Sequence, residues 1–230
     1  DPSNQLSGQS RNQILADAMR FVIETEAGEE VLKPGSLRIT ERNNAAVSWM
    51  ATQKNRHFEV QCTGEFGFDG LVDYRLQVKS LSDIKVKDIR LMVPYTAYAA
   101  KYMMGLGHKG GLRPDSTIYW RWNVEKHQDK IWMGNVNAGL NFCFKDENYK
   151  RPLVNIYYGL GKLKLPVSWG NANRGGIDIG PDKEGTVRMT VYSGERAMQK
   201  GDVLHYNFNM LVTPVKPLNL REMAEKHFYH

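Results

Sequence analysis

The chain has 230 residues, the size of one large all-β domain, and 41% of them are hydrophobic, enough for a sizeable core. No apolar run reaches the ~20 residues that a membrane-spanning helix needs, so we expect no membrane insertion. The formal net charge is +6. The basic residues are scattered with acids between them, which is typical of solvated strand faces and not of a nucleic-acid-binding surface.

The first residues and the cysteines say little about the cellular compartment. The chain opens on Asp1-Pro2-Ser3, without the basic and then apolar stretch of a signal peptide. A fragment of a longer protein and a mature exported protein fit this start equally. Cys62 shares a predicted strand face with Phe58 and Val60, so we expect it to be buried, whereas Cys143 is expected on a more polar face. Free thiols are favoured, and a disulfide between the two stays open.

Alternation of apolar and polar residues is the dominant pattern, and it predicts β-strands. Along the chain these are residues 36–40, 45–52, 58–63, 74–79, 87–93, 118–122, 130–134, 140–145, 154–158, 187–191 and 204–212. Turn signals such as Arg42-Asn43-Asn44 and Asp69-Gly70 lie between them. Many short strands at this spacing predict an all-β fold, a large antiparallel β-sandwich (supersandwich-like) with one or two short helices.

Two helices are predicted. Thr96 is placed to cap a helix over residues 97–104, with Gly105 after its last turn. A second helix begins near Asn219, with Glu222 in the capping-box position. The two prolines before it resemble an interdomain linker. We therefore assign residues 1–217 to a sandwich domain and 218–230 to a segment that leads into a further domain.

The segment from Gly105 to Gly110 matches the G-x-G-x-x-G pattern of dinucleotide-binding loops. That motif needs a strand before it and a helix after it, and here a helix is predicted before it and Pro114 follows soon after. The glycines instead predict a tight loop with exposed backbone. His108, Lys109 and Arg113 make this loop cationic. We expect it to approach a ligand or a neighbouring domain closely.

Two further groups have side chains that suit carbohydrate. Trp120 and Trp122 share one strand face, and if exposed they would form a stacking platform for sugar rings. The alternation with Ile118 favours a core position instead, which leaves Arg121 on the open face. Asn135 and Asn137 could bind sugar hydroxyls or cap a turn, and the turn is favoured.

Catalytic and metal-binding patterns are weak. Asp146-Glu147 lies in a predicted turn, and a hydrolase built on Glu65 with Asp69 or Asp73 would place its acids in a glycine-rich hairpin rather than an apolar pocket. The six histidines show no metal-ligand spacing. A calcium loop at residues 178–184, with Asp178, Asp182 and Glu184, competes with a favoured Gly-Pro turn. We therefore expect no cofactor.

An ordered series of segments then carries a family resemblance. They are residues 65–71, 88–95, 102–107, 109–111, 113–114, 120–122, 132–140, 166, 168–169 and 213–214. From about Ile14 to Pro217 the chain resembles the N-terminal β-sandwich domain of glycoside hydrolases of family 123 and their relatives in gut Bacteroidetes.

This resemblance implies an accessory domain that precedes a catalytic (β/α)8 barrel. In such proteins the barrel carries an Asp-Glu pair that assists the N-acetyl group of the substrate, so no catalytic residue transfers to this chain. The resemblance implies a periplasmic or extracellular location, with the barrel and a glycan as partners. The candidate contact residues are Gly105, Gly107, His108, Lys109, Arg113, Trp120, Trp122, Asn135 and Asn137. A free-standing carbohydrate-binding module is the alternative.

Overall fold

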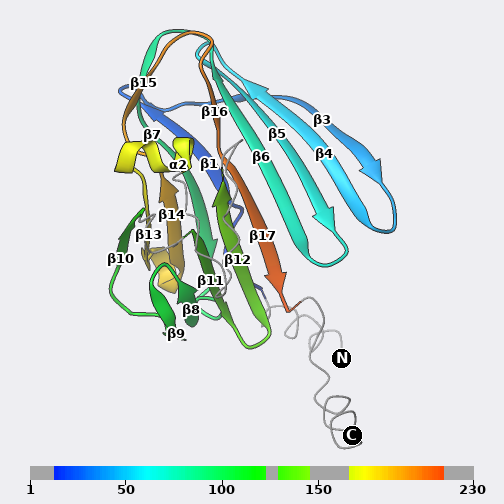
Figure 1. The fold of residues 1–230 in the computed structure, drawn as a ribbon, viewed down its shortest axis with the longest axis vertical. Helices are drawn as coiled ribbons and strands as arrows, with labels where there is room; N and C mark the ends of the chain where they lie inside the picture. Colours follow the sequence, from blue (N-terminus) through cyan, green and yellow to red (C-terminus); the bar gives the residue numbers. More distant parts are fainter. Residues whose placement is uncertain (1–12, 123–128, 146–165, 215–230) are drawn as a thin grey trace, which may run out of the picture.

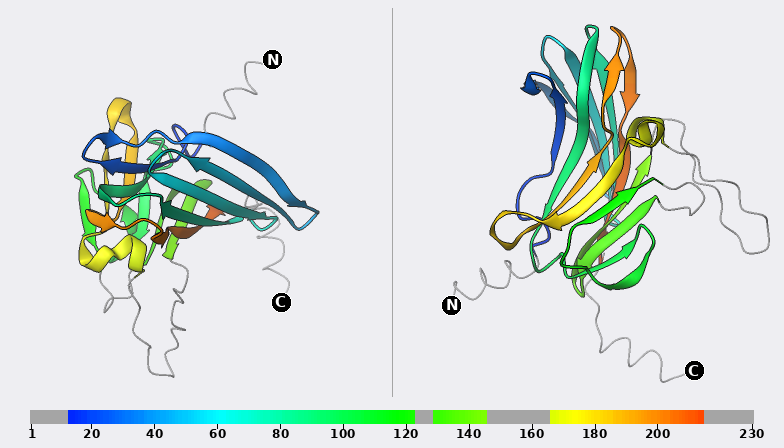
Figure 2. Two further views of the ribbon diagram at one scale, coloured as in Figure 1. Left: turned by 90° about the horizontal axis from the view of Figure 1, so that it is seen from above. Right: turned by 90° about the vertical axis from the view of Figure 1, so that its left-hand side faces the viewer.

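The computed structural model describes residues 13–122, 129–145 and 166–214. They form two large antiparallel β-sheets that pack face to face (Figures 1 and 2), which confirms the predicted all-β sandwich. Within this part of the chain, no helix has the length and apolar character needed to cross a bilayer.

Sheet A has seven strands, in the order β10-β13-β14-β7-β1-β2, with β15 also paired to β7. Its strands are β1 (Arg20–Thr25), β2 (Gly28–Glu29), β7 (Ile84–Tyr95), β10 (Ile118–Arg121), β13 (Gly176–Pro181), β14 (Val187–Tyr192) and β15 (Arg196–Met198).

Sheet B has ten strands, in the order β3-β4-β5-β6-β17-β12-β11-β8-β9, with β16 also paired to β6. Its strands are β3 (Lys33–Arg42), β4 (Ala46–Lys54), β5 (Phe58–Gly67), β6 (Leu71–Ser80), β8 (Tyr102–Gly105), β9 (His108–Leu112), β11 (Lys130–Asn135), β12 (Ala138–Lys145), β16 (Val203–His205) and β17 (Asn207–Thr213). The strands β3 to β5 extend past the edge of sheet A (Figure 2).

Helical structure among the described residues consists of short pieces. They are α2 (Val167–Gly170) and two 3-10 turns, η1 (Asn171–Asn173) and η2 (Lys183–Gly185). Trp169 of α2 is fully buried, and its Nε1 donates a hydrogen bond of 3.0 Å to the carbonyl of Asn207. Its ring meets Tyr206 edge-on at 4.8 Å and Phe144 at 5.5 Å. One large aromatic side chain thus joins α2 to the core of sheet B, because aromatic rings bury much apolar area at once.

The core lies between the sheets and follows the period-2 pattern. In β14, Val187, Met189 and Val191 are buried, and in β17 Phe208 and Met210 are buried. The predicted strands within the described residues are confirmed, most of them with longer bounds than the alternation indicated. The exceptions are 118–122, which ends at Arg121, and 204–212, which is divided at Tyr206 into β16 and β17.

The predicted helix over residues 97–104 is wrong. Thr96 does act as a cap, since its Oγ1 accepts the Ala99 N–H at 3.2 Å, but the helix stops after one turn. The chain then enters β8, where Met103 is buried in the core and pairs with Met133 of β11. Strand pairing across the sheet therefore overrides the local helical preference. The strand predicted at 154–158 and the helix predicted from Asn219 lie outside the described residues.

Both cysteines are free thiols, as favoured by the sequence. Cys143 is buried, which corrects its expected place on a polar face: its Sγ lies 3.7 Å from Oδ2 of the buried Asp129. Cys62 is half-buried, and burial raises the pKa of its thiol to about 11. A reactive cysteine needs an electropositive environment that lowers its pKa. Neither cysteine has such an environment.

Candidate functional site

The glycine-rich segment forms a tight hairpin between β8 and β9. Leu106 and Gly107 have φ of 50° and 88°, which are the left-handed angles that a two-residue hairpin turn requires. Gly105 approaches β11 so closely that a Cβ there would lie 2.3 Å from the carbonyl oxygen of Lys130. Gly105 and Gly107 thus serve the local fold, and the hairpin belongs to no dinucleotide-binding motif.

The cationic residues of this segment divide into two kinds. His108 and Lys109 lie exposed on β9, the edge strand of sheet B. Arg113 is turned inward, where its Nε donates to the carbonyl of Ala100 at 3.0 Å and its Nη1 donates to the carbonyl of Pro114. Arg113 therefore fixes the turn after Thr96 to the end of β9, whereas His108 and Lys109 remain available to a partner.

Asn135 and Asn137 belong to the hairpin between β11 and β12. Asn135 donates to the carbonyl of Tyr98 at 3.1 Å, and its Oδ1 accepts the N–H of Val136 at 2.8 Å. These bonds make Asn135 a turn residue, the role that the sequence favoured. Asn137 and Val136 are exposed at the tip.

Trp120 and Trp122 lie in the core, each 7% exposed, with their rings edge-to-face at 4.9 Å. They cannot act as an exposed platform for sugar rings in this conformation. Arg121 lies on the opposite, outer face of sheet A, as the alternation predicted.

A second group of residues around Arg121 was missed by sequence reasoning. Its Nη1 lies 3.4 Å from Oδ1 of Asp178, and its guanidinium lies over the ring of Tyr192 at 5.1 Å. Tyr119, 71% exposed, is directly opposite Asp178 in the sheet register. The alternation that places Trp120 inside also places Tyr119 outside, so this signal was present in the sequence.

The electrostatics of this group follow from partial burial. Burial raises the pKa of Asp178, and the charge of Arg121 opposes that shift. Burial and the negative charge of Asp178 raise the pKa of Tyr192 to about 12. Asp182, the other described acid of the suggested calcium loop, pairs with Arg188 at 3.2 Å. Both of these carboxylates therefore already have a cationic partner.

The acids considered for a hydrolase are either exposed or already bound in ion pairs and hydrogen bonds. Glu65 and Asp73 face each other across β5 and β6. Asp73 pairs with Arg75 at 3.1 Å and with Lys145 at 3.0 Å. Asp69 accepts the N–H of Leu71 at 3.1 Å, the turn role expected for Asp69-Gly70.

Beside these hairpins, apolar residues lie across the outer face of sheet B, interrupted by Asn141 of β12. The register places Leu112 opposite Tyr102, Met104 opposite Trp132, and Leu211 opposite Leu71. Leu112 is 71% exposed, Met104 53% and Leu71 36%. We call these six residues the apolar strip. Its strands lie side by side at the lower end of the molecule in Figure 1.

Trp132 anchors the apolar strip beside the end of β17. Its Nε1 donates to Oγ1 of Thr213 at 2.8 Å. The indole covers Gly134 and Gly139, where a Cβ would lie 2.6 Å and 2.9 Å from ring atoms. The strip is thus built on small residues and lies next to Thr213, at the end of β17.

Comparison with protein families gives one match that covers most of the chain. The family model "Glycoside hydrolase 123, third domain" matches residues 2–214. No curated protein gives a match.

Among solved structures, a galactose mutarotase-related enzyme from Lactobacillus acidophilus is 7% identical with a TM-score of 0.45, covering 80% of this chain and 73% of that one. An α-galactosidase from Lactobacillus brevis is 8% identical with a TM-score of 0.49, covering 84% and 28%. A heparan sulfate lyase from Pedobacter heparinus is 8% identical with a TM-score of 0.41, covering 92% and 26%. The chain thus spans little more than a quarter of the last two.

Proposed function

This chain belongs to the family of the third domain of glycoside hydrolase 123, and from that premise we propose that it is a non-catalytic accessory domain of an N-acetylhexosaminidase-like enzyme. In this proposal it packs on a catalytic barrel that is absent from the chain and edges the glycan site of that barrel. Its position before the barrel and a periplasmic or extracellular location are parts of the same proposal.

The observation that carries the proposal is the apolar strip. Leu112 and Met104 expose apolar side chains on β9 and β8, and Leu71 does so on β6, with Trp132, Asn141 and Leu211 on the strands between Met104 and Leu71. Thr213, at the end of β17, lies beside Trp132. Contiguous exposed apolar surface marks an interaction site, and domains within one chain meet through such patches. A domain that follows Pro214 begins within reach of the strip.

The exposed polar residues around the strip are suited to form the polar rim of an interface. His108 and Lys109 lie on β9 next to Leu112, and Asn137 lies at the tip of the neighbouring hairpin. Interfaces surround an apolar centre with polar, solvent-accessible groups. We assign these three residues to contacts with the barrel or with its glycan.

The test replaces Met104 and Leu112 with serine in the complete parent enzyme. We expect the sandwich and the barrel to unfold in separate thermal transitions, because each lost apolar side chain removes roughly 1.5–3 kcal/mol of docking free energy. Calorimetry and hydrolysis of an N-acetylhexosaminide report the outcome.

The matched control is Leu37→Ser with Val203→Ser, two exposed apolar residues of β3 and β16 outside the apolar strip. It should leave both the transitions and the rate unchanged. A strip variant that unfolds and hydrolyses like the unaltered enzyme would remove the basis for docking through this face.

The alternative is a free-standing carbohydrate-binding module, and the outer face of sheet A favours it. Tyr119 offers an exposed ring beside the Arg121–Asp178 pair, which combines a stacking surface with charged hydrogen-bonding groups. This alternative requires that the chain alone bind a neutral oligosaccharide and that Tyr119→Ala abolish the binding in calorimetric titration. Because Trp120 and Trp122 are buried, their fluorescence should stay constant.

A further inference from the structure

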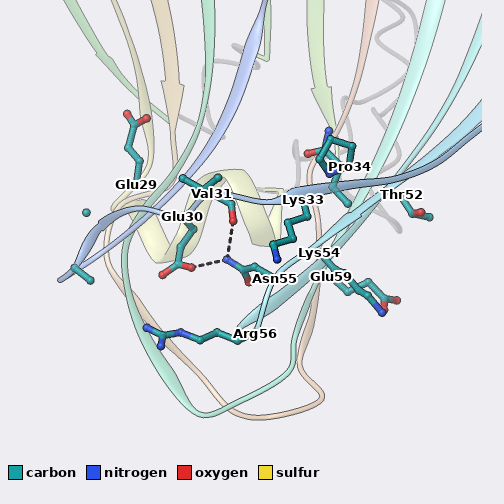
Figure 3. A pocket seen from close by; sticks show the side chains of 14 residues that line it. Glu29, Glu30, Val31, Lys33, Pro34, Thr52, Lys54, Asn55, Arg56 and Glu59 are labelled. Atoms are coloured by element: carbon teal, nitrogen blue, oxygen red, sulfur yellow. Dashed lines mark hydrogen bonds between the residues drawn. The ribbon is translucent and has the colours of Figure 1, made fainter.

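A groove of about 920 Å³ lies beside Asn55, at the turn between β4 and β5 (Figure 3). It is enclosed by the turn between β1 and β2, the start of β3, and the turn between β4 and β5. The strand β6 connects this region to the apolar strip, since Leu71 at its start belongs to the strip and Ser80 at its end pairs with Phe58. A volume of this size accommodates a short oligosaccharide.

One side of the groove carries ordered hydrogen-bonding groups. Oε2 of Glu30 accepts a hydrogen bond of 2.6 Å from Asn55, and Oε1 accepts one of 3.1 Å from Thr25. Asn55 is itself fixed, because its Oδ1 accepts the N–H groups of His57 and Phe58, both at 2.8 Å. Figure 3 shows Asn55 directed at Glu30 and at the carbonyl of Val31. Asn55 thus uses both of its N–H groups and both lone pairs of its Oδ1 within the protein, whereas the carboxylate of Glu30 keeps acceptor sites for the hydroxyl groups of a ligand.

The other side of the groove is cationic. Lys33 and Lys54 are direct partners in the register of β3 and β4, and Arg56 follows on the turn. Like charges placed opposite each other destabilise a strand pair. None of these three cations makes an ion pair with another described residue, although Glu59 lies opposite Lys54.

Glu59 is the acid nearest the cationic side and makes no ion pair with another described residue, whereas the two acids on the other side of the groove are already bound. Glu29 is bound by Arg20 at 2.9 Å and by Arg90 at 3.0 Å, both of which lie outside the groove. Glu30 is occupied by the neutral donors described above. The groove thus separates a hydroxyl-binding side from a side with unpaired positive charge.

We propose that this groove binds an acidic saccharide, with its uronate or sulfate group against Lys33, Lys54 and Arg56 and its hydroxyls against the Glu30 carboxylate that Asn55 holds in place. Ion-assisted hydrogen bonds to carboxylate or sulfate oxygens are the strong contacts in such a site. None of the residues that line the groove is aromatic, so it offers no stacking surface for a nucleobase. The proposal is independent of docking through the apolar strip.

The experiment titrates the chain by calorimetry at about 0.15 M salt, with tetragalacturonate, a heparin tetrasaccharide and a neutral cellotetraose. We expect an acidic tetramer to bind about tenfold or more tightly than the neutral one, and Lys33→Gln with Lys54→Gln to weaken it by about tenfold. The single variant Arg56→Gln, on an exposed turn, should weaken it in the same direction. Whichever acidic tetramer binds more tightly shows whether the groove prefers carboxylate or sulfate groups.

The matched control is Lys87→Gln with Lys183→Gln, exposed lysines that do not line the groove. It removes the same charge and should keep the affinity. Equal weakening by the control would show a general charge effect and overturn the site. Failure of both acidic tetramers to bind, equal binding of cellotetraose, or tighter binding of a single-stranded oligonucleotide would also overturn it.

Discussion

Gly175 lies where the chain turns from η1 into β13, directly against the backbone of Trp169. A Cβ at Gly175 would lie 1.9 Å from the carbonyl oxygen of Trp169, and that residue is fixed in the core. At Gly64 the obstacle is instead the indole of Trp49, at 2.1 Å, and this half-buried side chain has room to move. The nature of the neighbour therefore decides what an added methyl group costs.

We predict that Gly175→Ala destabilises the protein by about 3 kcal/mol and Gly64→Ala by only about 1 kcal/mol. Urea unfolding monitored by circular dichroism measures both. Equal losses, or a larger loss at Gly64, would contradict the packing described around Trp169.

Cys62 should be a slow thiol. Burial raises its pKa to about 11, so at pH 8 its thiolate fraction is about a hundredfold lower than that of an ordinary cysteine. Alkylation by iodoacetamide, followed by mass spectrometry with a glutathione reference, should show this retardation in the folded chain and its loss in urea. Alkylation of folded Cys62 at the reference rate would contradict its burial.

Some side-chain positions follow from the sequence and others do not. Period-2 alternation correctly predicts that Trp120 is buried and that Arg121 faces outward. It could not predict that Arg113 binds the carbonyl of Ala100, because that contact depends on where β9 ends relative to the preceding turn. Nor could it predict the burial of Cys143, which lies against Asp129 on the nominally polar face.

At the scale of elements, Asn171 joins α2 to the loop before β15. Its φ is 40°, and its Nδ2 donates to the carbonyls of Ser193 at 2.8 Å and Glu195 at 2.9 Å. The residue therefore combines a left-handed backbone with hydrogen bonds between segments that are distant in sequence. Two substitutions separate these roles.

We expect Asn171→Gly to lose the side-chain hydrogen bonds but keep the backbone angle, at a cost of about 1–2 kcal/mol. Asn171→Ala should cost roughly 1 kcal/mol more, since alanine also resists the positive φ. Thermal unfolding of the two variants gives the difference. If alanine is tolerated better than glycine at this position, the backbone assignment is wrong.

Local pattern predicts strands well in this protein and pairing poorly. Strands such as β6, β14 and β17 were visible as alternating runs, but β8 was taken for a helix because its sequence follows a good N-cap at Thr96. The apolar strip was not visible at all. Its residues come from segments far apart in the chain, and only the register of sheet B brings Met104, Trp132 and Leu211 together.

At the scale of the whole molecule, buried tyrosines should make the fold sensitive to alkali. Burial raises the pKa of Tyr95 well above its usual range, and burial raises the pKa of Tyr206 to about 12. Below pH 10 these groups are protonated in both the folded and the unfolded chain, so they have no effect on the pH dependence. Above pH 10 the unfolded chain loses protons that the folded chain keeps, so stability falls as pH rises.

We predict that Tyr206 alone lowers the unfolding free energy by about 2–3 kcal/mol between pH 10 and 12. Tyr206→Phe should lose its hydroxyl contact with Ser193 and be less stable at pH 8, but its stability should fall less steeply with pH. Tyr119→Phe, at an exposed position, should keep the original slope. Urea unfolding across this pH range decides, and identical slopes for all three proteins would contradict the prediction.

The molecule as a whole has two distinct ends on sheet B. The end beside Thr213 carries the apolar strip and the exposed hairpins, and the end beside Asn55 carries the charged groove. A domain docked on the first end would leave the groove at the second end open. The two proposals can therefore hold together or fail separately.

The most direct test of the accessory-domain proposal is amide hydrogen exchange in β8 and β9, compared between this chain alone and the complete parent enzyme. Docking through the apolar strip predicts that the amides of the exposed edge strand His108–Leu112 exchange about tenfold or more slowly in the parent enzyme. Equal exchange rates for the amides of β8 and β9 in the two proteins would contradict the proposal.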